Sequence, residues 1–189
     1  MLYSSQMKQV ELNFRTWGGR REGAGRPKKQ GSGMPHVPRA TLAPRFPVHA
    51  TWRMQRGVWN LRSGRSARAL APALFKRAVR EGFRLVHFAL MGDHIHLMVE
   101  ASDRVRLARG MQGLGVRIAR ALNRMMKRDG RVIAKRYHAH ILKTPTEVRY
   151  ARNYLLRNAH KHYGWKGPDP FAPRRALAEP RTWLMRQHC

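Results

Sequence analysis

The sequence predicts an α+β protein of the ferredoxin-like βαββαβ type, with an antiparallel sheet and an extra helix at its C-terminal end. Apolar, strand-like runs at 83–90 and 94–100 flank a Gly-Asp turn, which is typical of a hairpin. Two longer segments carry apolar residues at spacings of three and four, as amphipathic helices do. The order of these patterns, β-α-β-β-α-β-α, is that of a split βαβ arrangement with one helix added.

Each element also has a local signal. Residues 48–54 alternate in polarity, as a half-buried strand does. Ser66 is a candidate N-cap, and Gly82 a candidate stop, for the first helix. Thr144-Pro145 is a typical opening of the last one. The expected elements are strand 48–54, helix 66–81, strands 83–90 and 94–100, a helix capped by Ser102 or Asp103 that runs to 127, strand 131–142 and helix 144–160.

The composition divides the chain into three parts. Residues 1–45 are rich in Gly, Pro and basic side chains and are expected to form a disordered tail. Residues 46–165 carry the periodic patterns and are expected to form one domain. In residues 166–189 Pro and Arg return, which indicates a basic C-terminal tail with one short helix.

The charge points to an anionic partner. Lys and Arg number 39 against 10 Asp and Glu, which gives a formal charge of +29. Nucleic acid neutralises such an excess through phosphate contacts, and a scaffold without chemistry is the competing interpretation. The lone cysteine is Cys189, and no apolar run approaches a membrane span. We therefore expect a cytoplasmic, nucleoid-associated protein without a membrane partner.

The pair His94 and His96 is the first candidate for chemistry. In a strand, residues two apart share a face, so both imidazoles project together while Ile95 and Leu97 point into the core. Two imidazoles at that spacing can share one divalent ion. The alternative is a pair of histidines on a solvated or DNA-facing sheet surface.

Two further His-x-His pairs have different contexts. His138 and His140 lie in a predicted strand after Arg136, where contact with a phosphate or a base is favoured over metal binding. His160 and His162 fall at a helix end, where positions two apart do not face each other.

The last helix carries two candidate tyrosine nucleophiles. Tyr150, Tyr154 and Asn158 are spaced by four and share one helical face. Only Tyr154 has an oxygen-bearing candidate metal ligand, Asn158, one turn onward. Tyr137 is expected to point away from the neighbouring His pair, and Tyr163 to be poorly fixed beside a glycine. The competing interpretation is that Tyr150 and Tyr154 only pack.

These segments resemble a known family. Met91-Gly-Asp-His-Ile-His-Leu-Met-Val-Glu100 resembles the His-hydrophobic-His motif of HUH endonucleases. Tyr154-Leu-Leu-Arg-Asn158 resembles the tyrosine helix of their single-tyrosine transposases. Asn158-Ala-His-Lys-His162 is similar to the Asn-Pro-Val-Lys-His segment of REP-associated tyrosine transposases. The resemblance covers roughly residues 45–163.

The resemblance implies a metal-dependent endonuclease and strand transferase that acts on single-stranded or hairpin DNA. Mg²⁺ or Mn²⁺ would bind His94, His96 and a third ligand, and Tyr154 would form a 5′-phosphotyrosine. Asn158 stands where many relatives have Gln, and Ala159 replaces Pro, so His162 rivals Asn158 as the third ligand. The resemblance leaves open whether the protein is a monomer or a homodimer.

The N-terminal tail has its own predicted role. Gly23-Ala-Gly-Arg-Pro-Lys28 looks like an AT-hook, which inserts arginine into a narrow A·T minor groove. A nonspecific basic tail is the alternative. The tail residues expected to contact nucleic acid are Arg20, Arg21, Arg26, Lys28 and Lys29.

Two non-catalytic functions compete with the transposase prediction. The first is a catalytically silent DNA-binding relative that represses or marks repeats. The second is an RNA-binding basic protein in which His94 and His96 only contact phosphate. Metal-dependent covalent trapping separates the enzyme from both.

Overall fold

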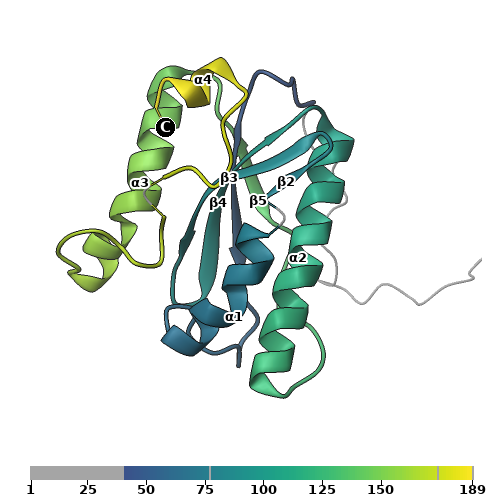
Figure 1. Ribbon diagram of the computed structural model, residues 1–189, viewed down its shortest axis with the longest axis vertical. Coiled ribbons are helices and arrows are strands. Elements are labelled where there is room, and N and C mark those ends of the chain that lie inside the picture. The colour runs from purple at the N-terminus through teal and green to yellow at the C-terminus, as the bar shows by residue number, and fades with distance from the viewer. Residues whose placement is uncertain (1–40, 77, 174, 189) are drawn as a thin grey trace, which may run out of the picture. The chain divides into compact units, whose positions relative to one another are not determined.

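The fold is a five-stranded antiparallel sheet with helices on both faces (Figure 1), which confirms the predicted ferredoxin-like α+β class. The computed structural model describes residues 41–188, apart from residues 77 and 174. The strands follow the order β2-β3-β4-β1-β5, which places the first predicted strand inside the sheet, between β4 and β5. The elements are β1 (Val48–Arg53), α1 (Gly64–Phe75), β2 (Val79–Arg80), β3 (Phe83–Leu90), β4 (His94–Ala101), α2 (Arg104–Met126), β5 (His138–Ile141), α3 (Pro145–Tyr163) and α4 (Trp183–Arg186).

One face of the sheet packs under α1 and α2 and holds the larger apolar core. The strands direct alternate residues to this core, as the period of two requires. Ile95 and Leu97 of β4 are fully buried there, and so are Val48 and Ala50 of β1. The residues between them on both strands therefore face α3, on the opposite side of the sheet.

Helix α2 is the longest element and closes this layer. Asp103 caps its N-terminus by accepting a hydrogen bond from the Arg106 amide, and Lys127 ends it in the left-handed conformation. Gly110 lies on its buried face, where a Cβ atom would come within 2.2 Å of the Phe83 ring of β3. Within residues 41–188, excluding the two that are not described, no helix is long and apolar enough to cross a membrane.

Several boundaries differ from the sequence prediction, including the end of the last helix, which is Tyr163 and not His160. The first helix begins after Ser63, not Ser66, because the Ser63 hydroxyl accepts the Ser66 amide hydrogen. It ends at Phe75, and Val79–Arg80 forms the edge strand β2, with the turn at Gly82 in the left-handed conformation. The predicted strand 131–142 is also too long, because β5 pairs with β1 over only four residues and Ile133 makes a single bridge to Met54.

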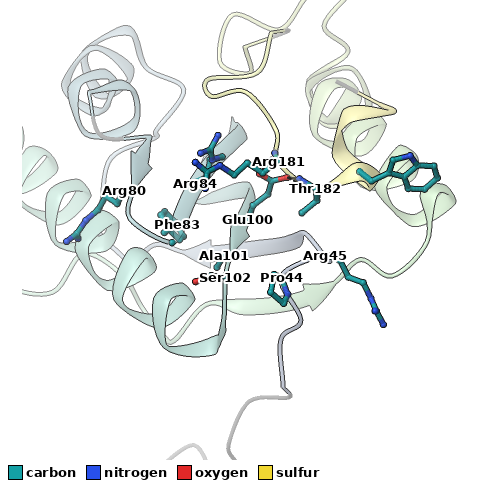
Figure 2. A pocket seen from close by; sticks show the side chains of 12 residues that line it. Pro44, Arg45, Arg80, Phe83, Arg84, Glu100, Ala101, Ser102, Arg181 and Thr182 are labelled. Carbon is teal, nitrogen blue, oxygen red and sulfur yellow. Dashed lines mark hydrogen bonds between the residues drawn. The ribbon is translucent and has the colours of Figure 1, made fainter.

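The segment after residue 165, expected as a tail, is anchored to the sheet and contains the short helix α4. The buried Glu100 carboxylate of β4 accepts hydrogen bonds from the Arg181 amide and from the amide and hydroxyl of Thr182, at 2.7–2.9 Å. Figure 2 shows these side chains in a pocket of about 400 Å³, with Arg45, Arg80 and Arg84 on its lining. This pocket lies at the Ala101 end of β4, away from His94.

Candidate functional site

His94 and His96 lie on the α3 side of β4, as their spacing predicts. Their ring centroids are 4.8 Å apart, with the ring planes perpendicular. Ile95 between them is buried in the core on the other face. The Asp93 carboxylate lies 2.7 Å from His94 Nδ1, and this contact is the main reason that the pKa of Asp93 lies below its usual range. An aspartate in that position orients the ring and leaves Nε2 of His94 for another ligand.

His96 is the buried member of the pair. Burial, followed by the nearby His49, His94 and His162, lowers its pKa from 6.5 to about 3. The ring is therefore neutral at neutral pH, and protons do not compete with a metal ion for its lone pair. Its Nδ1 atom lies 3.1 Å from the Thr51 hydroxyl and 3.2 Å from His49 Nε2. Its Nε2 atom is buried without a hydrogen-bond partner among the described residues.

Helix α3 brings Tyr154 against this pair. A complete capping box begins the helix: the Thr144 hydroxyl accepts the Glu147 amide hydrogen, while the Glu147 carboxylate accepts the Thr144 amide hydrogen. The Tyr154 ring lies 5.1 Å from the His96 ring, centroid to centroid. Tyr150, one turn earlier, is more exposed and lies beneath the Arg149 guanidinium instead. Of the two helical candidates, Tyr154 is therefore the one that contacts His96.

Both candidates for a third ligand lie on α3, beyond Tyr154. Asn158 is buried, and neither its amide oxygen nor its amide nitrogen has a hydrogen-bond partner among the described residues. His162 is exposed, and its charge contributes to the low pKa of His96. In the described part of the chain, no three His, Cys, Asp or Glu side chains gather closely enough to hold a metal ion. A metal ion at His94 and His96 would therefore need an amide such as Asn158, or His162 after a movement, as its third protein ligand.

The sheet extends the site with further imidazoles. His138 and His140 of β5 are exposed and pair across the ladder with Thr51 and His49 of β1. All four therefore share the α3 side of the sheet with His94 and His96. His140 Nε2 also lies 3.6 Å from the Glu147 carboxylate. The second His-x-His pair is thus exposed on the same face as the first, with β1 between the two pairs.

Two other predicted residues lie elsewhere. Arg136 is exposed in the segment before β5. Tyr137 stacks edge-on against Trp52, with centroids 6.0 Å apart, and packs with the core under α1 and α2. Tyr137 therefore points away from the histidines, as expected. Arg20, Arg21, Arg26, Lys28 and Lys29 lie outside the described residues.

A clamp ties the end of α3 to the start of β4. The Gly92 amide donates to the Tyr163 hydroxyl at 2.9 Å, so the expectation that Tyr163 is poorly fixed is wrong. The Arg62 guanidinium lies over both the Tyr163 and the Phe171 rings. It also makes two hydrogen bonds, of 2.8 and 3.0 Å, to the buried Asp169 carboxylate. The clamp fixes the tyrosine helix relative to the histidine strand.

Sequence reasoning missed His49, Thr51, Asp93 and the clamp residues. His49 and Thr51 had a visible signal, since the alternation of 48–54 puts both on the polar face of their strand. The sequence does not reveal that β1 lies beside β4, and only that neighbourhood gives the two residues a role. Arg62 and Asp169 are 107 positions apart, and no local pattern joins them.

Comparison with known proteins places this arrangement in a family. The sequence model of the family "Transposase IS200 like" matches residues 47–158, which is more than half of the chain. No curated protein matches the sequence.

Two solved structures are similar to this chain at low sequence identity. A REP-associated tyrosine transposase bound to a REP hairpin superposes with a TM-score of 0.53 at 13% identity, over 74% of this chain and 82% of that one. A putative transposase from Deinococcus radiodurans has a TM-score of 0.43 at 20% identity, over 66% of this chain and 92% of its own. The fold agrees with the family match, and the chain belongs to the IS200-like transposase family.

Proposed function

We propose that the protein is a metal-dependent endonuclease and strand transferase for single-stranded DNA, with Tyr154 as the nucleophile. The family supports a DNA transposase role. The observation that carries the finer proposal is the packing of the Tyr154 ring against His96, whose Nε2 atom has no partner among the described residues. A nucleophile beside imidazoles that can bind a metal ion is compatible with metal-assisted phosphoryl transfer.

The donor set fits Mn²⁺ or Mg²⁺ at His94 and His96. A buried imidazole nitrogen without a hydrogen bond is costly unless a ligand satisfies it, and the Asn158 amide has the same need. When bound, the ion would polarise a nonbridging oxygen of the scissile phosphate and favour attack on phosphorus. Imidazole ligands favour Mn²⁺ over Mg²⁺. Asn158 or His162 would complete the protein ligands.

In this proposal Tyr154 attacks the phosphorus through its phenol oxygen. The bond to the 3′ oxygen breaks, and that oxygen leaves as a 3′-hydroxyl with a proton that balances the one lost by the phenol. The product is a 5′-phosphotyrosine, and its ester bond conserves the energy that a second 3′-hydroxyl uses to rejoin the DNA. The packing of the Tyr154 ring against His96 and the clamp at Tyr163 support fixed placement, which nucleophiles need.

The surroundings of the site support single-stranded DNA as the substrate class. His138 and His140 are exposed on the same face and supply donors for phosphates or base edges. A structural neighbour binds a REP hairpin, which supports hairpin-bearing single-stranded DNA as the substrate. A role for the N-terminal basic tail on A·T-rich duplex stays a prediction from its sequence.

Covalent trapping tests the proposal. The full chain is incubated with labelled hairpin-bearing single-stranded DNA and Mn²⁺ and is then resolved by denaturing electrophoresis. We expect a protein–DNA adduct that requires Mn²⁺ and disappears in Tyr154→Phe, a loss of at least about a thousandfold. Tyr150→Phe, on the same helix, is the matched control and keeps the adduct. An adduct that persists in Tyr154→Phe excludes this nucleophile.

A further inference from the structure

The surroundings of His96 suggest a role for two residues of the neighbouring strand. Thr51 lies directly opposite His96 in the β1–β4 ladder, and His49 is its diagonal neighbour. The Thr51 hydroxyl and His49 Nε2 lie within 3.2 Å of the same atom, His96 Nδ1. No described residue makes a hydrogen bond to the other ring nitrogen, Nε2, which is buried. Nδ1 of His96 therefore has two close polar partners, whereas Nε2 has none among the described residues.

We propose that Thr51 and His49 are positioning residues that hold the proton of His96 on Nδ1 and aim its Nε2 lone pair at the metal. The proposal rests on the proposed metal site. A neutral imidazole carries one proton, and both oxygen and imidazole nitrogen can accept a hydrogen bond from it. With the proton on Nδ1, both contacts become acceptors and Nε2 becomes the ligand atom.

The Thr51 hydroxyl and the His49 ring are held in place by different means. Thr51 is β-branched and sits in a strand, so its χ1 angle is restricted and its hydroxyl stays in place. His49 is held from the far side, because it pairs with His140 of β5, and its ring packs 5.3 Å from the His96 ring. The His49 ring also lies 6.3 Å from the Tyr154 ring, which restricts it further. The pair thus fixes both the proton and the plane of the His96 ring.

The two histidines of the pair have different kinds of polar partner. A carboxylate, Asp93, contacts His94, which is partly exposed. Neutral groups contact His96, which is buried. A second carboxylate beside the buried ring would itself need desolvation, whereas a hydroxyl and an imidazole carry no charge. Neutral support therefore suits the buried ligand.

The test uses the full chain without DNA and has two readouts. Long-range ¹H–¹⁵N NMR reports which nitrogen of His96 carries the proton in metal-free protein, and calorimetry gives the affinity for Mn²⁺. The variants are Thr51→Val, which removes only the hydroxyl, Thr51→Ser, which restores it, and His49→Gln. Thr146→Val, which removes an exposed hydroxyl from α3, is the matched control.

We expect His96 to carry its proton on Nδ1 in the unmodified protein and in Thr146→Val. Thr51→Val and His49→Gln should each mix the two tautomers and weaken Mn²⁺ binding by about tenfold or more. Thr51→Ser should recover most of both readouts. A proton on Nε2 of the unmodified metal-free protein overturns the positioning proposal.

The remaining outcomes separate this proposal from the proposed function. Unchanged Mn²⁺ affinity and tautomer in both Thr51→Val and His49→Gln overturn the positioning role and leave the metal site standing. If the unmodified protein binds no Mn²⁺, the metal site and the positioning role fall together. Because Thr51→Val preserves shape and the NMR readout needs a folded protein, a folding defect is recognised in the same spectra.

Discussion

The two faces of the sheet differ in what they bury. Under α1 and α2, β1 and β4 present Val48, Ala50, Ile95 and Leu97, an apolar set with no polar group to satisfy. On the α3 side, the same strands present His49, Thr51, His94 and His96, and the rings meet. A strand with a period of two thus places core side chains and candidate site side chains on opposite faces of a single element. Substitutions one residue apart on β4 should therefore have unrelated consequences.

The largest expected effect lies on the α3 side. We predict that His94→Ala or His96→Ala lowers the cleavage rate by at least about a hundredfold, because the ion that polarises the phosphate loses a ligand. DNA affinity should stay within about twofold, since most of it comes from Lys and Arg contacts with phosphate. Single-turnover cleavage in titrated Mn²⁺ and filter binding measure the two quantities. A normal cleavage rate in either variant contradicts the metal assignment.

Substitution of the next residue of β4, Leu97, should instead affect the stability of the fold. Leu97→Ala removes a fully buried side chain from the α1–α2 core and should lower the free energy of unfolding by about 2–5 kcal/mol. Under conditions in which the variant is folded, it should still form the covalent adduct, because Leu97 faces away from Tyr154. Urea unfolding and covalent trapping on the same sample check both statements. Loss of the adduct from fully folded Leu97→Ala would show that the faces are not independent.

The α3 side should also make stability depend on pH. Burial is the main cause that lowers the pKa of His49 and His87 to about 4 and that of His96 to about 3, against 6.5 when unperturbed. The unfolded chain therefore binds these protons first. The stabilisation is complete above about pH 6.5 and is lost as pH falls towards 4, by up to about 1.4 kcal/mol per pH unit for each proton.

Urea unfolding at several pH values between 7.5 and 5 measures this slope. His87→Leu removes one of the three groups, and its slope should be shallower by about one proton. A free energy of unfolding that does not change over this range contradicts the neutral, buried state of the three rings.

The smallest expected effect lies on the outer surface of the helices. Neither α1 nor α2 contains an acidic residue, and the groove between them, of about 420 Å³, is lined in part by Arg68, Arg117, Arg120 and Arg124. We predict that Arg120→Gln with Arg124→Gln weakens DNA binding by less than about tenfold. The logarithmic salt slope should fall by about one for each phosphate that the variant no longer neutralises. An unchanged slope would exclude this face from DNA binding.

Local sequence patterns predict the fold class because the longest strands and helices have regular spacings of apolar residues. The 94–100 run and the helix from 103 to 127 agree with β4 and α2 to within one residue at each end. The pattern failed where pairing sets the length: Val79–Arg80 is too short to show a period, and β5 stops at its four-residue pairing with β1.

The site was predictable to the extent that it is local. His94 and His96 share a strand face, and Tyr154 and Asn158 share a helix face, so spacing alone groups each pair. Their meeting depends on strand order and on the packing of α3, which a single sequence does not display. The same limit hid His49, whose role comes from a neighbour 47 positions away.

Peptide mapping of the covalent adduct tests the central claim most directly. The protein is trapped on hairpin-bearing single-stranded DNA with Mn²⁺ and digested, and the peptide that carries the nucleotide is sequenced by mass spectrometry. We predict a 5′-phosphate ester on Tyr154 of α3. A nucleotide on Tyr150 or Tyr137, or the absence of any adduct from folded, Mn²⁺-loaded protein, would contradict it.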